Sequence, residues 1–211
     1  MIRLKVWVVA LLSALAFSVL IGVGPASATE LCSTRTDPCS GTMYGAGTAV
    51  KVSLVAGSSA TFTGTVGAVT CKQFDFSGLT KSTGGPFFTV TGEITAATLG
   101  GCTDNFGAPC NAKPQNLAWA FEIHAVETAS GNGTMTLSPP AAVIECELGI
   151  DCTFSVTSAL LNVSGGNPAR LKAIKVPLTP KPSGTHMICP SGTVAWSAEW
   201  AIATPSPLFV M

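Results

Sequence analysis

Glu122, Ile123 and His124 follow one another and offer the pair of side chains best suited to acid–base chemistry in this chain. In a β-strand, residues two apart share a face, so the Glu122 carboxylate and the His124 imidazole would point together. Such a pair can move a proton or hold a metal ion. Trp119 and Phe121 would share the opposite, apolar face with Ile123. We therefore expect Glu122 and His124 to form an ordinary polar pair on a solvated strand face, and they are only weak catalytic candidates.

The other carboxylates carry no catalytic or metal-binding motif. They include Asp75, Glu93, Asp104, Glu127, Glu145, Glu147, Asp151 and Glu199. A glycosidase needs two carboxylates about 5–10 Å apart across a cleft, and the sequence marks no such pair. Glu145, Glu147 and Asp151 could bind calcium, but their spacing lacks the calcium-loop pattern. We expect a solvated acidic edge there, and neither a metal ion nor another cofactor in the protein.

Nucleophile and phosphate-binding motifs are absent from the sequence: it contains no G-x-S-x-G, no H-E-x-x-H and no phosphate-binding loop. Trp119, Trp196 and Trp200 could stack on sugar rings, but the alternation of their strands places them on apolar faces. We expect them in the core. Asn132 and Asn162 each begin an N-glycosylation sequon, which matters only in a host that glycosylates asparagine.

The eight cysteines all lie downstream of residue 28. An even number of cysteines in an exported chain indicates disulfides, and a zinc site would show closer ligand pairs. Three pairs are near in sequence and leave one long-range pair. The spacing predicts the bonds Cys32–Cys39, Cys102–Cys110, Cys146–Cys152 and Cys71–Cys189, with no free thiol.

Hydrophobic alternation with a period of two dominates the chain, and no stretch holds a helical stripe. Candidate strands are 49–55, 60–66, 69–74, 87–98, 117–126, 134–137, 143–147, 152–156, 160–163, 171–176 and 193–202. Glycine- and proline-rich turns separate them. The pattern predicts an all-β fold: one disulfide-bonded antiparallel β-sandwich, jelly-roll or immunoglobulin-like, with about 10–11 short strands.

The first 28 residues have the order of a secretory signal peptide. Arg3 and Lys5 precede an apolar run, and Ala26-Ser27-Ala28 supplies small residues for cleavage. An uncleaved membrane anchor is the alternative. We expect cleavage after Ala28 and therefore a secreted protein that is not bound to the membrane. The mature chain should comprise an N-terminal cysteine loop over 29–41 and a single domain over 42–211.

Composition excludes several classes of protein. Charged residues make up 10% of the chain, and 11 basic residues balance 11 acidic ones. A balanced charge gives no basic surface for nucleic acid. The hydrophobic content of 47% is too high for a disordered chain.

Four glycine- or proline-rich segments carry a resemblance: Gly100-Gly101-Cys102, Gly131-Asn132-Gly133-Thr134, Gly165-Gly166-Asn167-Pro168-Ala169 and Thr204-Pro205-Ser206-Pro207-Leu208. Through them the chain resembles small secreted actinobacterial proteins of unknown function. The resemblance implies export from a Gram-positive bacterium and implies no activity.

These observations favour a secreted, non-catalytic extracellular module, structural or binding, with a cell-wall, glycan or protein partner. Two other functions remain open. One is a secreted hydrolase acting on carbohydrate through carboxylates such as Glu122. The other is a protease inhibitor or toxin-like effector that presents a rigid loop such as 105–109.

Overall fold

The computed structural model describes residues 29–65, 67–85, 88–127, 130–147, 149–183 and 189–211. Within these ranges the chain is all-β and antiparallel. Its strands are β1 (Leu31–Cys32), β2 (Ala49–Leu54), β3 (Ala60–Gly64), β4 (Gly67–Thr80), β5 (Val90–Asp104), β6 (Pro109–Gln115), β7 (Trp119–Glu127), β8 (Asn132–Ser138), β9 (Ala141–Cys146), β10 (Asp151–Ser155), β11 (Ala159–Ser164), β12 (Ala169–Pro182), β13 (Val194–Thr204) and β14 (Phe209–Val210). The prediction of an all-β, antiparallel, disulfide-bonded chain is confirmed.

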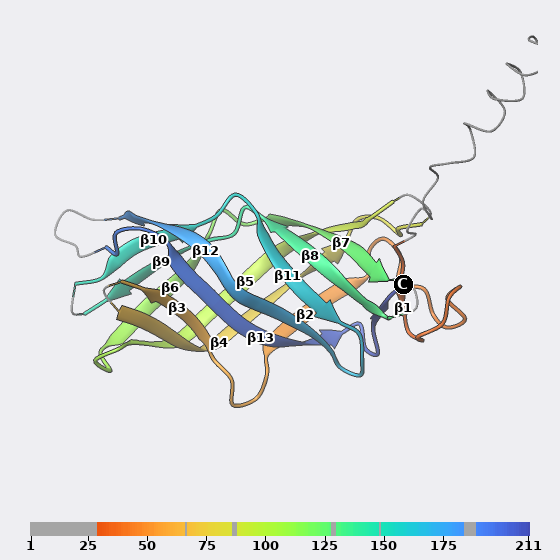
Figure 1. Ribbon diagram of the computed structural model, residues 1–211, viewed down its shortest axis with the longest axis horizontal. Coiled ribbons are helices and arrows are strands. Elements are labelled where there is room, and N and C mark those ends of the chain that lie inside the picture. Colours follow the sequence, from red (N-terminus) through yellow and green to blue (C-terminus); the bar gives the residue numbers. More distant parts are fainter. Residues whose placement is uncertain (1–28, 66, 86–87, 128–129, 148, 184–188) are drawn as a thin grey trace, which may run out of the picture.

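Four long strands, β4, β5, β12 and β13, run along an elongated body (Figure 1). Shorter strands complete each half of it. β2, β7, β8 and β11 lie in the half that carries β1, and β3, β6, β9 and β10 lie in the other half.

The strand pairings close the sheet on itself. Pairs β5–β4, β10–β12 and β13–β3 join strands that would otherwise lie far apart in the sheet order. Several strands that follow each other along the chain pair directly, such as β4 with β5, β7 with β8 and β12 with β13. Other consecutive strands do not pair: β2 with β3, β6 with β7, β8 with β9, and β10 with β11. Strands β2 to β13 thus belong to a single sheet of 12 strands.

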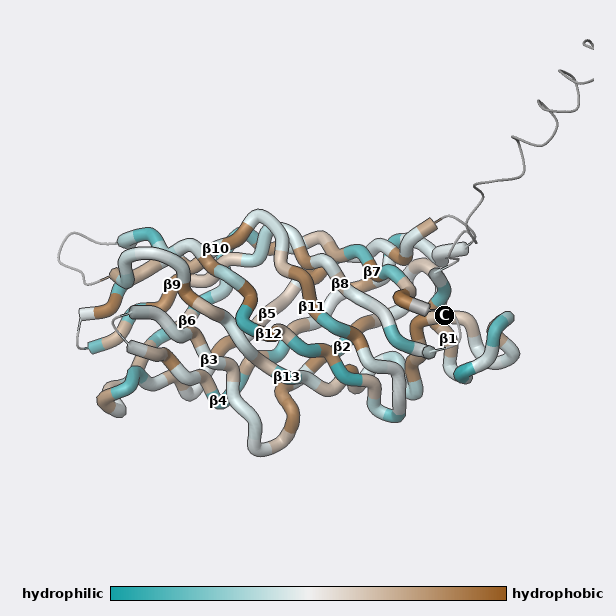
Figure 2. Tube along the Cα trace, in the orientation of Figure 1, coloured by the Kyte–Doolittle hydropathy of each residue, from teal (hydrophilic) through white to brown (hydrophobic). Residues whose placement is uncertain are grey.

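Alternation along the strands separates an apolar interior from a polar exterior (Figure 2). β13 is the clearest case, because Trp196, Ala198 and Trp200 are buried while Ser197 and Glu199, which alternate with them, are partly exposed. The Trp200 ring meets Phe74 and Phe76 edge-on, with centroids 5.4 and 5.6 Å apart. The Trp200 indole N–H donates to the Phe74 carbonyl at 2.9 Å, which satisfies a polar group that burial would otherwise penalise.

Three disulfides gather at the end of the body away from β1, and they correct the predicted pairing. The bonds are Cys71–Cys102, Cys110–Cys146 and Cys152–Cys189, and only the fourth, Cys32–Cys39, was predicted. The predicted bonds Cys71–Cys189, Cys102–Cys110 and Cys146–Cys152 are absent.

The antiparallel register allows the observed bonds Cys71–Cys102 and Cys110–Cys146, although it brings Cys102 opposite Cys110 as well. It places Cys71 opposite Cys102, Cys102 opposite Cys110, and Cys110 opposite Cys146, on four adjacent strands. Nearness along the chain therefore does not decide which cysteines bond. The four disulfides leave no free cysteine among the described residues and indicate an oxidising, extracellular setting.

The N-terminal segment covers the opposite end of the body. β1 pairs with β14, and Leu31 is 1% exposed. The Tyr44 hydroxyl donates to the Pro207 carbonyl at 2.8 Å. Residues 31 and 32 therefore pack against the C-terminal end of the chain. The predicted signal peptide, residues 1–28, lies outside the described residues. Among those that are described, no helix is long and apolar enough to span a membrane.

Candidate functional site

Glu122 and His124 lie on the outer face of β7. His124 Nε2 and Glu122 Oε2 are 3.8 Å apart, and the two side chains are 48% and 58% exposed, respectively. Phe121 and Ile123 point inward and are buried, as the alternation predicts. Across the sheet, Glu122 faces Thr136 of β8. The pair has ordinary solvated surroundings, and the described chain contains no cluster of three potential metal ligands.

The other candidate carboxylates are dispersed over the surface with local partners. Glu145 lies opposite Asp151 across the β9–β10 pair, and the Asp151 carboxylate accepts a hydrogen bond from Ser183. Glu199 pairs with Lys172 at 3.3 Å. Glu145 is exposed, and Asp151 and Glu199 are partly exposed, so these three carboxylates lie at the surface.

Asp104 is the buried exception, and its role is structural. Its Oδ1 accepts hydrogen bonds from the backbone N–H groups of Phe106 and Ala108, both at 2.9 Å. The carboxylate thus holds the β5–β6 turn and presents Phe106, which is 77% exposed. This turn is the loop considered above for a protease inhibitor, although Cys102 and Cys110 do not bond to each other at its base.

All three tryptophans proposed as a sugar platform are buried: Trp119, Trp196 and Trp200 are 2%, 3% and 0% exposed. The core assignment made from the alternation is therefore correct. Trp119 and Trp200 each donate their indole N–H to a backbone carbonyl. Trp196 Nε1 has no partner.

The shorter strands break at the middle of the body, in a zone that we call the waist. It comprises residues 116–118, 139–140 and 156–158, which separate β6 from β7, β8 from β9 and β10 from β11. The first two breaks lie side by side in the sheet, because the residues next to them are paired across the strands. Gln115 pairs with Ala141 on one side of the breaks, and Ala120 pairs with Ser138 on the other. Prolines 139 and 140 have no N–H to give to a strand ladder. The wall of the closed sheet is therefore interrupted at the waist.

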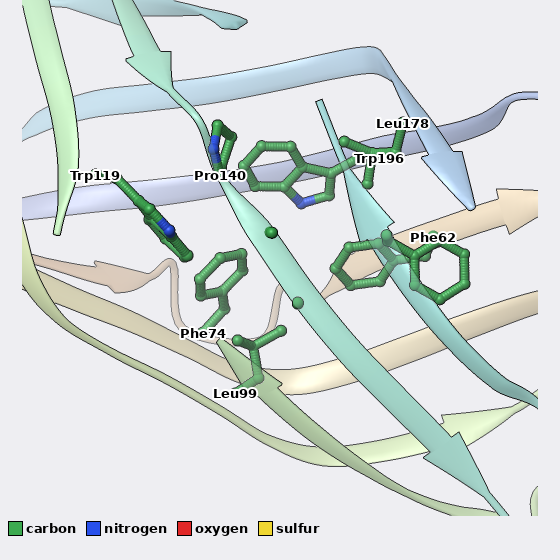
Figure 3. Close-up of a pocket in the computed structure, with 10 residues that line it drawn as sticks. Phe62, Phe74, Leu99, Trp119, Pro140, Leu178 and Trp196 are labelled. Atoms are coloured by element: carbon green, nitrogen blue, oxygen red, sulfur yellow. The ribbon is translucent and has the colours of Figure 1, made fainter. Parts of the chain in front are cut away.

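An aromatic cavity lies inside the body at the waist (Figure 3). Its lining is Phe62, Phe74, Leu99, Trp119, Pro140, Ala141, Ala142, Phe154, Leu178 and Trp196. The cavity measures about 20 Å³, which is room for about one water molecule. In Figure 3 the Trp196 nitrogen turns toward the space between Phe74 and Phe62.

A groove of about 330 Å³ opens on the outer face between β11 and β12. It forms because β12 pairs with β11 only up to Lys172 and with β10 only from Thr179 onward. The register between β12 and β13 shifts between Ala173 and Val176, and Lys175 adopts a φ of 51° there. Sequence reasoning missed this site, since no glycine or asparagine marks the position that needs the left-handed backbone.

The groove between β11 and β12 is lined by both apolar and polar side chains. Leu160 and Ile174 are 60% and 63% exposed. Ser158, Asn162 and Lys175 line it beside them. This combination suits contact with another molecule, because exposed aliphatic side chains gain free energy when covered.

A second, polar groove of about 230 Å³ lies over β2, β4 and β5. Its lining includes Lys51, Ser53, Asp75, Ser77 and Thr98. Here an ammonium group, one carboxylate and three hydroxyls gather on the outer face, where they can exchange hydrogen bonds with a hydroxyl-rich molecule.

Comparison of the chain with protein-family models, with curated proteins and with solved structures gives no match.

Proposed function

We propose that the protein is a secreted, non-catalytic binding module that holds an extracellular partner on the outer face of its closed sheet. The groove between β11 and β12 carries the proposal, since it presents Leu160 and Ile174 beside polar side chains. The scatter of the described carboxylates and the exposed setting of Glu122 and His124 argue against an enzyme. The signal-like residues 1–28 and the four disulfides support secretion.

We infer that the front and back of the ring pack on each other as two layers, in the manner of a sandwich. The contact between the Phe62 and Phe154 rings, 6.0 Å apart at their centroids, supports this packing, because β3 and β10 are not paired with each other. The disulfides would fasten one end of it. Such a body gives grooves on its exterior a fixed shape, which reduces the ordering that binding costs.

A protein partner fits the groove between β11 and β12 best. Protein interfaces combine an apolar centre with a hydrogen-bonding rim. Leu160 and Ile174 provide the first, and Asn162 and Lys175 provide the second. The proposal therefore names an extracellular or cell-wall protein as the partner.

A glycan is the second candidate partner, and the polar groove favours it. Ser53, Ser77 and Thr98 offer hydroxyls, and Asp75 offers a carboxylate, which are groups that bind sugar hydroxyls. Binding there would rely on hydrogen bonds, because the three tryptophans are buried and cannot stack on a sugar.

Retention assays with purified cell wall, common polysaccharides and defined extracellular proteins test the proposal. One variant, Leu160→Ser with Ile174→Ser, removes the apolar centre of the first groove. Another, Lys51→Gln with Asp75→Asn, removes the charges of the second. Val126→Ser is the matched control, since Val126 is 61% exposed on β7, outside both grooves.

We expect one groove variant to weaken retention at least about tenfold, because hydrophobic anchors and buried hydrogen bonds dominate binding. The Val126→Ser control should bind as the wild type does. Retention that none of the variants alters, or no retention of any partner, would overturn the proposal. A glycan-hydrolysis panel and a protease-inhibition screen run alongside. Release of sugar would establish the hydrolase, and inhibition lost in Phe106→Ser would establish the inhibitor.

A further inference from the structure

Basic side chains concentrate on β12, in a set that we call the basic row. Four of the nine lysine and arginine residues downstream of residue 28 lie on this strand, which carries no carboxylate. All four are exposed or partly exposed, whereas Leu171 and Val176 of the same strand are buried. β12 runs along the body (Figure 1), so the row extends over about 36 Å at about 3.3 Å per residue. Its members are Arg170, Lys172, Lys175 and Lys181.

The basic row has few carboxylates to neutralise it. Lys172 pairs with Glu199 of β13 at 3.3 Å. The other three cations form no ion pair with a described residue. Besides Glu199, the strands that flank β12 contribute one carboxylate, Asp151 of β10. A row of unneutralised cations attracts a partner that carries negative charges.

The groove between β11 and β12 lies within the basic row and leaves strand edges open. β12 has no ladder partner on its β11 side from Ala173 to Leu178, because pairing with β11 stops at Lys172 and pairing with β10 begins at Thr179. Across the groove, residues 159–161 of β11 pair only with β8. Backbone groups without a ladder partner are a template for another extended chain. The groove therefore favours a partner segment in an extended conformation.

Leu160 and Ile174 favour a peptide over other chains of negative charge. They line the groove and are 60% and 63% exposed, and Lys175 lines it beside them. A phosphate polymer has no apolar group to cover these side chains. A peptide can place an aliphatic side chain over them and acidic side chains on either side, which removes apolar surface from water as well as pairing charges.

We propose that an extended, acidic segment of the partner protein lies along β12, with an aliphatic side chain over Leu160 and Ile174 and carboxylates beside Lys175 and Lys181. A segment of about a dozen residues spans the basic row. This inference rests on the proposed binding of a protein in the groove, and it adds the chemistry of the segment that is bound.

Selection from a library of random peptides of about a dozen residues, displayed on phage, tests the chemistry of the segment. The enriched peptides are then titrated by fluorescence anisotropy. Lys175→Gln with Lys181→Gln removes two exposed cations of the basic row. Lys72→Gln with Lys113→Gln is the matched control, because it changes the net charge equally at two exposed lysines on β4 and β6. Thermal melts establish that the variants remain folded.

We expect selection to enrich aspartate and glutamate on either side of an aliphatic residue. The enriched peptides should bind Lys175→Gln with Lys181→Gln about fivefold more weakly, because two exposed ion pairs are lost, and should bind the control as they bind the wild type. Inorganic polyphosphate should bind more weakly than the peptides. The inference is overturned if no peptide is enriched, if the enriched peptides are neutral or basic, if the control weakens binding equally, or if polyphosphate binds more tightly.

The retention assay separates this inference from the proposed function. Retention of a protein partner that is lost in Leu160→Ser with Ile174→Ser, but kept in Lys175→Gln with Lys181→Gln, would overturn the acidic segment and leave the binding module standing. Retention that no groove variant alters would overturn the proposed function itself, whatever peptides are enriched.

Discussion

Phe121 and its neighbours on β7 allow the inside and the outside of the sheet to be tested within four residues. Phe121→Ala removes a ring that is 1% exposed. The double substitution Glu122→Gln with His124→Gln changes two side chains that are about half exposed, with His124 Nε2 and Glu122 Oε2 3.8 Å apart. The substituted residues of the two variants are close together in the sequence, but Phe121 is buried whereas Glu122 and His124 are exposed.

The packing around Phe121 sets the size of the first effect. A Cβ placed on Gly92 would lie 2.0 Å from the Phe121 Cζ, so the ring fills the space above that glycine. Truncating such a ring leaves a cavity and costs about 3–5 kcal/mol. For a domain of this size we expect the melting temperature to fall by about 10 °C. The double glutamine variant should change stability by less than about 0.5 kcal/mol, as surface substitutions do.

Thermal and denaturant unfolding, followed by circular dichroism, measure both effects. Phe121→Ala should lower the midpoint clearly, while the glutamine variant should overlay the wild type. The reasoning fails if the glutamine variant melts far below Phe121→Ala. A slip of one residue in the register of β7 exchanges its faces, and that result would place Glu122 and His124 in a buried polar site.

Three further outcomes follow from the packing and the register. Peptide mapping under non-reducing conditions should join Cys71 to Cys102, and a peptide that joins Cys71 to Cys189 would contradict the strand register. Gly78→Ala should destabilise the protein by more than about 1 kcal/mol in denaturant unfolding, because its Cβ would lie only 1.9 Å from the Glu93 carbonyl oxygen; an unchanged midpoint would contradict that contact. Asp104→Ala should lower the free energy of unfolding by about 1–3 kcal/mol, because two hydrogen bonds to backbone N–H groups are lost. Asp104→Asn keeps one acceptor oxygen and should unfold close to the wild type. Equal melting of the two variants would refute the role of Asp104 in the turn.

Much of the fold could be predicted from alternation, since burial on one face leaves a period of two in the sequence. It placed Trp196 and Trp200 of β13 inside and Glu122 and His124 of β7 outside. It missed β6, whose sequence Pro109–Gln115 has little hydrophobic character. Alternation reports the face of a residue, and it carries no information on which strands are neighbours.

The remaining features depend on contacts between distant segments. Closure of the sheet and the Cys71–Cys102 bond both follow from the β4–β5 register, which sequence spacing does not encode. The groove at Leu160 and Ile174 arises where β12 changes partners. The sequence does not predict that the Trp196 N–H is unpaired, because Trp119, Trp196 and Trp200 all lie on the apolar faces of alternating strands.

Hydrogen–deuterium exchange of the protein, with and without the partner retained in the binding assay, tests the proposed function most directly. The account predicts slower exchange in 158–162 and 174–177, where the groove between β11 and β12 is covered. Protection confined to the polar groove, over 51–53 and 75–77, would move the contact there and favour the glycan. Protection confined to the 105–109 turn, or to the β7 strand around Glu122 and His124, would contradict binding through either groove.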